Sequence, residues 1–299
     1  MPMYYNERSI IFFDGKFIKA NEVKGDLYSQ SLHYGNGIFE GIRAYNTSNG
    51  PRIFKAKEHY ERLIFGTEVM TIPFDYEVDE LIDITYELLK KNELNDAYIR
   101  PLITVGPNMG LGSSDVSFLI IQCWPWDRLM GDELLKVKTS PFQRPNPKAC
   151  FVSAKVTGHY VNSILARNDA TKTGHDEALL MDMHGNVAEC TGANIFMEKD
   201  GKLMTPPKGH IMAGITRSTI IEICERENIP VSETHFRPED LKQADSAFFT
   251  GTAAEVAGLR SIDEYEFPLE WERSLGYKLS KLYTQEVLEV HKNQVSRAV

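Results

Sequence analysis

The sequence has few cysteines and places them far apart. None of the four belongs to a C-x-x-C pair or has a histidine nearby at the spacing of metal ligands. A disulfide framework and a zinc site are therefore not indicated, and no metal is expected. The sequence predicts reduced, mostly buried thiols at Cys123, Cys150, Cys190 and Cys224.

Basic clusters and long apolar runs are also missing. The chain carries 33 basic and 42 acidic residues, a net charge of −9, with no lysine or arginine cluster that would follow a phosphate backbone. No run approaches the ~20 apolar residues of a membrane span. The first residues, MPMYYNERSIIFF, lack the basic start and apolar stretch of a signal peptide. We therefore expect a cytoplasmic enzyme acting on small molecules, with no nucleic-acid or membrane partner.

The usual nucleotide and zinc-hydrolase motifs are absent as well. The chain contains no G-x-x-x-x-G-K-[ST] and no H-E-x-x-H. The stretch YGNGIFEG, residues 34–41, contains Gly35 and Gly37 but has Glu40 where a dinucleotide fingerprint needs its third glycine. The sequence therefore argues against a Rossmann fold.

Length and composition predict two folded domains. The chain has 299 residues, of which 42% are hydrophobic and 25% charged, and a domain takes about 150 residues. Proline, glycine and charges break the pattern at WPWDRLMGDE, residues 124–133, which indicates an interdomain linker. The predicted domains are therefore 1–123 and 134–299.

Hydrophobic periodicity predicts mixed helices and strands, without the strict βαβ alternation of a doubly wound sheet. Helices are expected to start near Lys57 and to cover 76–94, 214–228 and 271–292, the third with Thr216 as its N-cap. Strands are expected at 9–20 (turning at Asp14-Gly15), 97–106, 116–124, 134–142, 151–163, 177–183, 186–190, 193–199 and 202–207.

Lys155 lies in FVSAKVTGHYVNS, residues 151–163, among residues typical of a half-buried strand. Because a buried ammonium group is costly, a lysine there normally turns to water unless its amine has a use. Tyr160 and Glu189 suggest a use for the Lys155 amine. Pyridoxal phosphate (PLP) chemistry needs an amine for a Schiff base, a donor to the ring oxygen and an anion at the pyridine nitrogen.

Two small-residue turns offer sites for the phosphate of such a cofactor. A phosphate binds backbone N–H groups at the start of a helix, together with a cation. GITR, residues 214–217, precedes a predicted helix, and FFTGTAAEV, residues 248–256, adds the Thr252 hydroxyl and further amides. The simpler interpretation of both motifs is a pair of well-capped helices.

Seven motifs in order give the chain a resemblance to the branched-chain amino-acid aminotransferases of PLP fold type IV. They are HYGNGIFEGIRAY (33–45), EHYERL (58–63), AYIRPL (97–102), AKVTGHYVNS (154–163), AECTGANIF (188–196), GITR (214–217) and FFTGTAAEV (248–256). The resemblance implies a mixed α/β fold with a small N-terminal α/β domain, a larger barrel-like C-terminal domain and PLP in the cleft between them. It also implies a homodimer, or a higher homo-oligomer, in which the other subunit completes the substrate site.

The resemblance implies roles for single residues. Lys155 corresponds to the catalytic Schiff-base lysine, Tyr160 to the partner of the ring oxygen, and Glu189 to the partner of the pyridine nitrogen. The phosphate cup is matched by Arg62, Ile215, Thr216 and Thr252. The substrate pocket is matched by the aromatic Tyr34, Phe39, Tyr98 and Trp126, by Arg100 for the γ-carboxylate of glutamate, and by Tyr98, Thr252 and Ala253 for the α-carboxylate.

The implied reaction is transamination of leucine, isoleucine and valine with 2-oxoglutarate, which gives branched-chain 2-keto acids and L-glutamate. The freed amine of Lys155 would move the α-proton. Because one methylene group discriminates by only ~1–3 kcal/mol, all three amino acids are expected to be accepted.

Three positions depart from the family pattern and bear on fine specificity rather than on the chemistry. Leu129 stands where many relatives have tyrosine, His159 where asparagine is frequent, and Ala193 where glutamate is common. A D-amino-acid transaminase or an aminodeoxychorismate lyase would share Lys155 and Glu189, but FEGIRAY and YIRP disfavour both. A PLP-binding protein without turnover is the alternative from another class.

Overall fold

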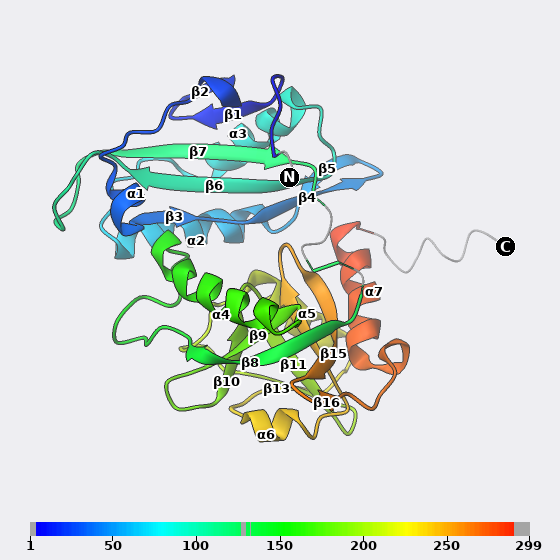
Figure 1. The fold of residues 1–299 in the computed structure, drawn as a ribbon. Coiled ribbons are helices and arrows are strands. Elements are labelled where there is room, and N and C mark those ends of the chain that lie inside the picture. Colours follow the sequence, from blue (N-terminus) through cyan, green and yellow to red (C-terminus); the bar gives the residue numbers. More distant parts are fainter. Residues whose placement is uncertain (1–3, 127–129, 132, 290–299) are drawn as a thin grey trace. The chain divides into compact units, whose positions relative to one another are not determined.

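The computed structural model describes residues 4–126, 130–131 and 133–289, which belong to two compact units (Figure 1). Unit 1 consists of Met1–Asp127 with Ala154–His159, and unit 2 of Arg128–Ser153 with Tyr160–Val299. The predicted linker includes residues 127–129 and 132, so the Leu129 departure lies outside the described residues. Residues 154–159 group with unit 1 rather than with the predicted second domain, because their backbone bonds to a strand of unit 1.

Unit 1 is built on a seven-stranded antiparallel sheet. The order is β2-β1-β7-β6-β4-β5, and β3 also pairs with β6. The strands are β1 (Ile10–Phe13), β2 (Lys16–Lys19), β3 (Gly37–Phe39), β4 (Ile42–Thr47), β5 (Gly50–Ile53), β6 (Ala97–Val105) and β7 (Ser117–Trp124). The turn between β1 and β2 places Asp14 and Gly15 at positive φ, as a two-residue hairpin requires. The predicted strands at 9–20, 97–106 and 116–124 are confirmed.

Two helices pack on this sheet, α2 (Ala56–Val69) against β3 and α3 (Val78–Lys91) against β1 and β7. Along α3 the buried residues recur at helical spacing: Leu81, Thr85, Leu88 and Leu89. The three leucines belong to the hydrophobic core of unit 1. Acidic residues occupy the first turn of α3 and lysines the last, which complements the helix dipole. The predicted helices near Lys57 and at 76–94 are confirmed. A 3₁₀ turn, η1 (Ala20–Glu22), and the short α1 (Gln30–Tyr34) precede β3.

Unit 2 contains a six-stranded barrel. The strands follow the order β10-β9-β8-β15-β14-β11, and a further pairing of β10 with β11 closes the ring. The strands are β8 (Leu135–Gln143), β9 (Glu177–Met181), β10 (Val187–Cys190), β11 (Asn194–Lys199), β14 (Ser246–Gly251) and β15 (Glu255–Ile262). Beyond β11 the sheet continues through β12 (Lys202–Thr205) and β13 (Val231–Glu233), and β16 (Tyr265–Glu266) pairs with β15. The predicted mixed α/β class with a barrel-like second part is confirmed.

Helices cover the barrel strands. The helix α4 (Tyr160–Lys172) packs on β8 and β9, while α5 (Ile215–Arg226) and α7 (Leu275–Val287) pack on each other and on β14. Short turns complete the unit: α6 (Pro238–Leu241) and η3 (Trp271–Arg273). No helix within the described part of the chain has the length and apolar character needed to cross a membrane.

Two sequence predictions about local structure are wrong. Residues 151–163 do not form a strand: 152–153 are a turn, Val156 makes one isolated bridge, η2 (Thr157–His159) follows, and Tyr160 begins α4. The sequence does not reveal this helix because α4 has almost no amphipathic period, with Val161, Ile164 and Leu165 exposed. Thr216 is not an N-cap, because α5 begins at Ile215 and Gly214 takes that position.

Candidate active site

The segment that carries Lys155 is held against β3 by its backbone. The carbonyl oxygen of Lys155 accepts from the backbone N–H of Phe39 (3.1 Å), and Val156 forms a bridge with Ile38. Gly158 donates its backbone N–H to the carbonyl oxygen of Gly35 (2.9 Å), where a Cβ on Gly35 would come within 2.7 Å of Gly158 Cα. Gly35 has φ +68°, so the conformation and the close approach both favour glycine. The position of Lys155 is therefore set by the main chain.

The aromatic ring of Phe39 lies beside two cations. Lys155 Nζ is 5.0 Å from the ring centroid, and the guanidinium carbon of Arg100 is 4.8 Å from it. Phe39 is buried on β3, and Arg100 is half-buried on β6. The predicted Schiff-base amine and the predicted carboxylate receptor thus share one aromatic neighbour, and cation–π attraction holds both beside it.

Aromatic rings surround Arg100 further along β6 and β7. Arg100 donates to the hydroxyl of Tyr98 (2.8 Å), whose ring is 4.7 Å from Trp126 and 5.3 Å from Trp124. Arg100 Nε and Trp124 Nε1 are buried, and neither has a hydrogen-bond partner among the described residues. Buried donors without acceptors are uncommon, so this aromatic cluster is suited to receive an anionic or carbonyl ligand group.

Arg62 binds a carboxylate of the protein itself. On α2 its Nε and a terminal nitrogen contact the two oxygens of Glu40 at 2.6 and 2.9 Å, and His59 Nδ1 lies 2.8 Å from the same carboxylate. Burial by itself would raise the pKa of Glu40, but Arg62 and His59 hold it well below the ordinary carboxyl range. Burial also lowers the pKa of His59, against the opposing effect of Glu40. The ionised Glu40 therefore accepts a hydrogen bond from the neutral imidazole of His59.

In unit 2 the Glu189 carboxylate is buried and surrounded by donors. Arg144 Nε lies 2.8 Å from one oxygen, Asn194 Nδ2 lies 2.8 Å from the other, and the backbone N–H of Met212 reaches both at 3.1 and 3.2 Å. Arginine, amide nitrogen and backbone N–H can only donate, so each favours the carboxylate form. Glu189 is thus a fixed negative charge on β10, as a partner for a protonated ring nitrogen must be.

The predicted phosphate residues of unit 2 lie at two backbone turns. Ile215 and Thr216 are the first two residues of α5, and the N-cap Gly214 has no side chain to occupy their N–H groups. Thr252 and Ala253 lie in the turn that joins β14 to β15. A twelve-residue helix presents free N–H groups and a positive dipole end at its start, which suits a phosphate.

The predicted residues fall into two groups. Unit 1 holds Lys155, Arg62, Tyr34, Phe39, Tyr98, Arg100 and Trp126, and unit 2 holds Tyr160, Glu189, Ile215, Thr216, Thr252 and Ala253. Tyr34 differs from Phe39 and Tyr98 in being 47% exposed, with its hydroxyl donated to the backbone of Met109.

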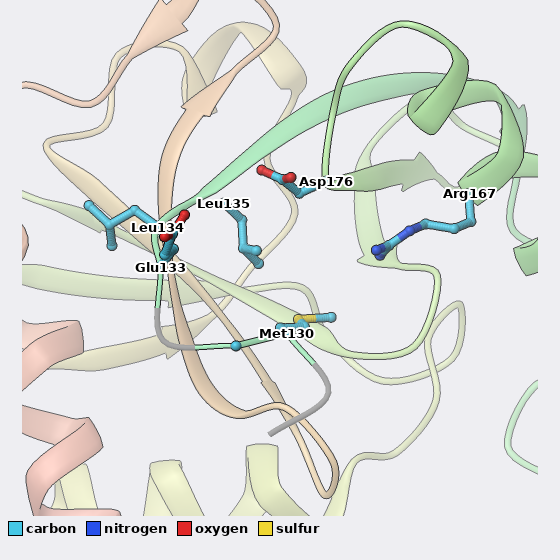
Figure 2. Close-up of a pocket in the computed structure, with 7 residues that line it drawn as sticks. Met130, Glu133, Leu134, Leu135, Arg167 and Asp176 are labelled. Atoms are coloured by element: carbon cyan, nitrogen blue, oxygen red, sulfur yellow. The ribbon is translucent and has the colours of Figure 1, made fainter. Parts of the chain in front are cut away.

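The pocket in Figure 2 belongs to unit 2 and is lined by Met130, Gly131, Glu133, Leu134, Leu135, Arg167 and Asp176. None of the predicted site residues is among the seven. This cavity is therefore separate from the chemistry that the motifs predict.

The sequence did not predict the residues that hold the predicted site residues in place. Glu40 and His59 anchor Arg62, while Arg144 and Asn194 anchor Glu189. His59 and Arg62 are three residues apart on one helix, a spacing that indicates a shared face. Arg144 lies 45 residues before Glu189 in the chain, so no local signal joins them.

Comparison with known proteins gives one consistent family. The class IV aminotransferase family model matches residues 37–262. The branched-chain-amino-acid aminotransferase of Pseudomonas aeruginosa is 37% identical over 280 residues, covering 92% of this chain and 91% of that protein.

Two solved structures are similar over nearly the whole fold. The branched-chain aminotransferase of Thermoproteus uzoniensis with norvaline has a TM-score of 0.89 at 33% identity, covering 96% of this chain and 97% of that one. The branched-chain amino acid aminotransferase of Thermobaculum terrenum in its PLP-form has a TM-score of 0.89 at 28% identity, with 96% of each chain covered.

Proposed function

The chain belongs to the class IV aminotransferases, and on that premise we propose that it transaminates branched-chain L-amino acids with 2-oxoglutarate, using PLP. The observation that carries the proposal is the arrangement around Phe39. An amine and a guanidinium lie at one aromatic ring, and the guanidinium nitrogen Nε has no partner among the described residues. This arrangement suits a pocket that receives apolar side chains and a carboxylate in turn.

The residues present fit PLP. The cofactor needs an amine, an anion for its ring nitrogen and N–H donors for its phosphate. Lys155 supplies the amine, Glu189 supplies a buried carboxylate surrounded by donors, and the uncapped start of α5 supplies the N–H groups. The donor chemistry of the chain therefore matches each part of the cofactor.

When bound, PLP supplies an electron sink for the electron pair left at the substrate α-carbon. The residues of this chain do the rest. Lys155 Nζ would take the α-proton as a general base, and the Glu189 carboxylate would hold a proton on the ring nitrogen. Tyr160 would donate its hydroxyl to the ring oxygen, and Arg62, Ile215, Thr216 and Thr252 would hold the phosphate.

Substrate recognition divides between apolar and charged groups. Phe39, Tyr98 and Trp126 pack against a leucine, isoleucine or valine side chain, while Arg100 turns its guanidinium to the γ-carboxylate of glutamate. The backbone N–H groups of Thr252 and Ala253, with the Tyr98 hydroxyl, bind the α-carboxylate.

A visible absorption experiment tests the proposal. The PLP-loaded protein is expected to be yellow, and its band should bleach on adding L-leucine and return on adding 2-oxoglutarate. D-Alanine should leave the band unchanged. A band unmoved by L-leucine would contradict the proposal and leave a protein that binds PLP without turnover.

The exposed apolar side chains of unit 1 support a homodimer, or a higher homo-oligomer. The segment of α1 and the loop at 108–112 are tied together by Gln30, which donates to the carbonyls of Gly110 and Gly112. Exposed apolar residues gather there: Leu27, Tyr28, Leu32, Tyr34, Met109 and Leu111. Such a surface suits burial by a second copy. Free thiols at all four cysteines suit the expected cytoplasmic location.

A further inference from the structure

Asn194 lies where the barrel of unit 2 closes. Glu189 of β10 and Asn194 of β11 are the paired residues of the contact that joins the two strands. Both side chains are buried, at 4% and 3% exposure. Asn194 Nδ2 donates to the Glu189 carboxylate at 2.8 Å. The cross-strand pair therefore fixes one oxygen of the predicted ring-nitrogen partner.

The same amide also holds the segment that leads into α5. Asn194 Nδ2 donates to the carbonyl of Met212 (3.0 Å), and the N–H of Met212 donates back to Glu189. A side chain on Gly214 would have its Cβ 1.9 Å from Asn194 Oδ1. Gly214 has φ −68° and ψ 128°, which any residue adopts, so glycine is needed here for space alone. The amide is packed against the N-cap of α5.

We propose that Asn194 is a positioning residue that sets the distance between Glu189 and the start of α5, so that the ring nitrogen and the phosphate of PLP are held at the same time. The inference rests on the proposed function. Asn194 connects the two anchor points through three direct contacts, with the Glu189 carboxylate, the Met212 carbonyl and Gly214. Because side chains held from several sides adopt one rotamer, the separation of the anchors is preset before the cofactor binds.

If Asn194 has this role, binding of the PLP ring and binding of its phosphate depend on each other through Asn194, which would not hold for an asparagine that only stabilises the fold. Pyridoxal has the ring and the aldehyde of PLP but no phosphate, so the ratio of the two dissociation constants measures what the phosphate adds. If Asn194 sets the spacing, its loss misaligns the phosphate whenever the ring is docked. The ratio should then fall although Asn194 is assigned no contact with the cofactor.

The experiment measures PLP and pyridoxal binding to apoprotein by absorbance and equilibrium dialysis. Asn194→Asp keeps the shape but replaces the donating amide by a carboxylate, and Gly214→Ala displaces the amide from the other side. Each should lower the pyridoxal-to-PLP ratio of dissociation constants at least tenfold, and should shift the ³¹P resonance of bound PLP. Two variants that act from opposite sides keep the test open if one of them does not fold.

Thr250→Val is the matched control. Thr250 lies directly opposite Asn194 on β14, is fully buried, and its hydroxyl has no partner among the described residues. Its ratio and ³¹P shift should equal those of the wild type. A preserved ratio in Asn194→Asp and Gly214→Ala, with only a lower melting temperature, would overturn the inference. Failure of the wild type to bind PLP would instead overturn the proposed function.

Discussion

Arg62 binds both oxygens of the Glu40 carboxylate, at 2.6 and 2.9 Å, and Glu40 is completely buried between β3 and β4 in the chain. A guanidinium held by a two-point contact has a defined plane and direction. The buried carboxylate therefore orients the cation that the phosphate is proposed to meet.

Replacing Glu40 by glutamine should destabilise the protein and weaken PLP binding. The substitution removes the charge that Arg62 contacts through two of its nitrogens, and breaking a buried ion pair in this way costs ~3–5 kcal/mol. Urea unfolding of the apoprotein measures the free energy, and a PLP titration measures the affinity. Glu61→Gln, which breaks the exposed contact with Lys57, is the control and should change stability by less than ~0.5 kcal/mol. Equal effects of the two substitutions would contradict this role of Glu40.

Acid should destabilise the protein in two steps. The pKa of His59 is lowered from an ordinary value of 6.5 and that of Glu40 from 4.5. In both cases the unfolded chain binds the proton first, so stability is lost as pH falls, from about 6.5 for His59 and from about 4.5 for Glu40. Urea midpoints between pH 8 and pH 3 measure the two steps.

His59→Asn should remove the first of these steps and leave the second. The matched control is the exposed His235, whose replacement by asparagine should leave both steps in place. Stability that increases between pH 7 and pH 5 in the wild type would contradict the assignment.

Lys155→Ala should give a folded protein without turnover. The contacts that dock this segment use the backbone of Lys155, so circular dichroism should match the wild type. Loss of the amine should lower the transamination rate by ~10⁴-fold, the upper part of the range for general acid–base catalysis. Lys148→Ala, at an exposed position, is the control. Near-normal turnover by Lys155→Ala would disprove the assigned chemistry.

Arg100→Ala should lower activity with 2-oxoglutarate as the amino-group acceptor much more than activity with branched keto acids. Because a hydrogen bond to a charged group contributes ~1.5–3 kcal/mol, kcat/KM for 2-oxoglutarate should fall roughly 10- to 100-fold. Branched keto acids lack the second carboxylate, so their kcat/KM should change far less. Arg52, which lies over the ring of Phe54, offers the control Arg52→Ala. An equal loss of kcat/KM with 2-oxoglutarate and with branched keto acids would show that Arg100 does not bind the γ-carboxylate.

Leu111→Asp should weaken self-association. Leu111 is 85% exposed in the single chain, and burying a leucine against a second copy contributes ~1.5–3 kcal/mol. Sedimentation velocity should show a shift toward monomer at micromolar concentration. Met183→Asp changes an exposed apolar residue of unit 2 and should leave the distribution as it is in the wild type. A monomeric wild type would contradict the dimer.

Motif order and local spacing in the sequence are enough to predict much of this molecule. The strands around Asp14-Gly15, the amphipathic α3 and the barrel strands from β8 to β11 all follow from periodicity and turn residues. Periodicity failed at α4, because a helix with little amphipathic character has no clear signal. The N-cap of α5 was misplaced for another reason, because Gly214 is required by the space beside Asn194, a contact from another element of the fold.

The residues that supply the chemistry could be identified from the sequence, because an amine, a carboxylate and small-residue turns are recognised from residue identity alone. The charge state and the neighbours of these groups could not be predicted from the sequence. Glu189 becomes a donor-held carboxylate only when β10 and β11 pair, and Lys155 reaches Phe39 only when its segment bonds to β3. Glu40 and Asn194 lie within quoted motifs and Arg144 in none, but the sequence does not show which charge each of them contacts, because contacts that span the fold leave no period in the chain. The sequence by itself thus determined the secondary structure elements and the types of reactive group, through local spacing and residue chemistry. Tertiary packing alone decided which side chains and backbone groups surround each reactive group.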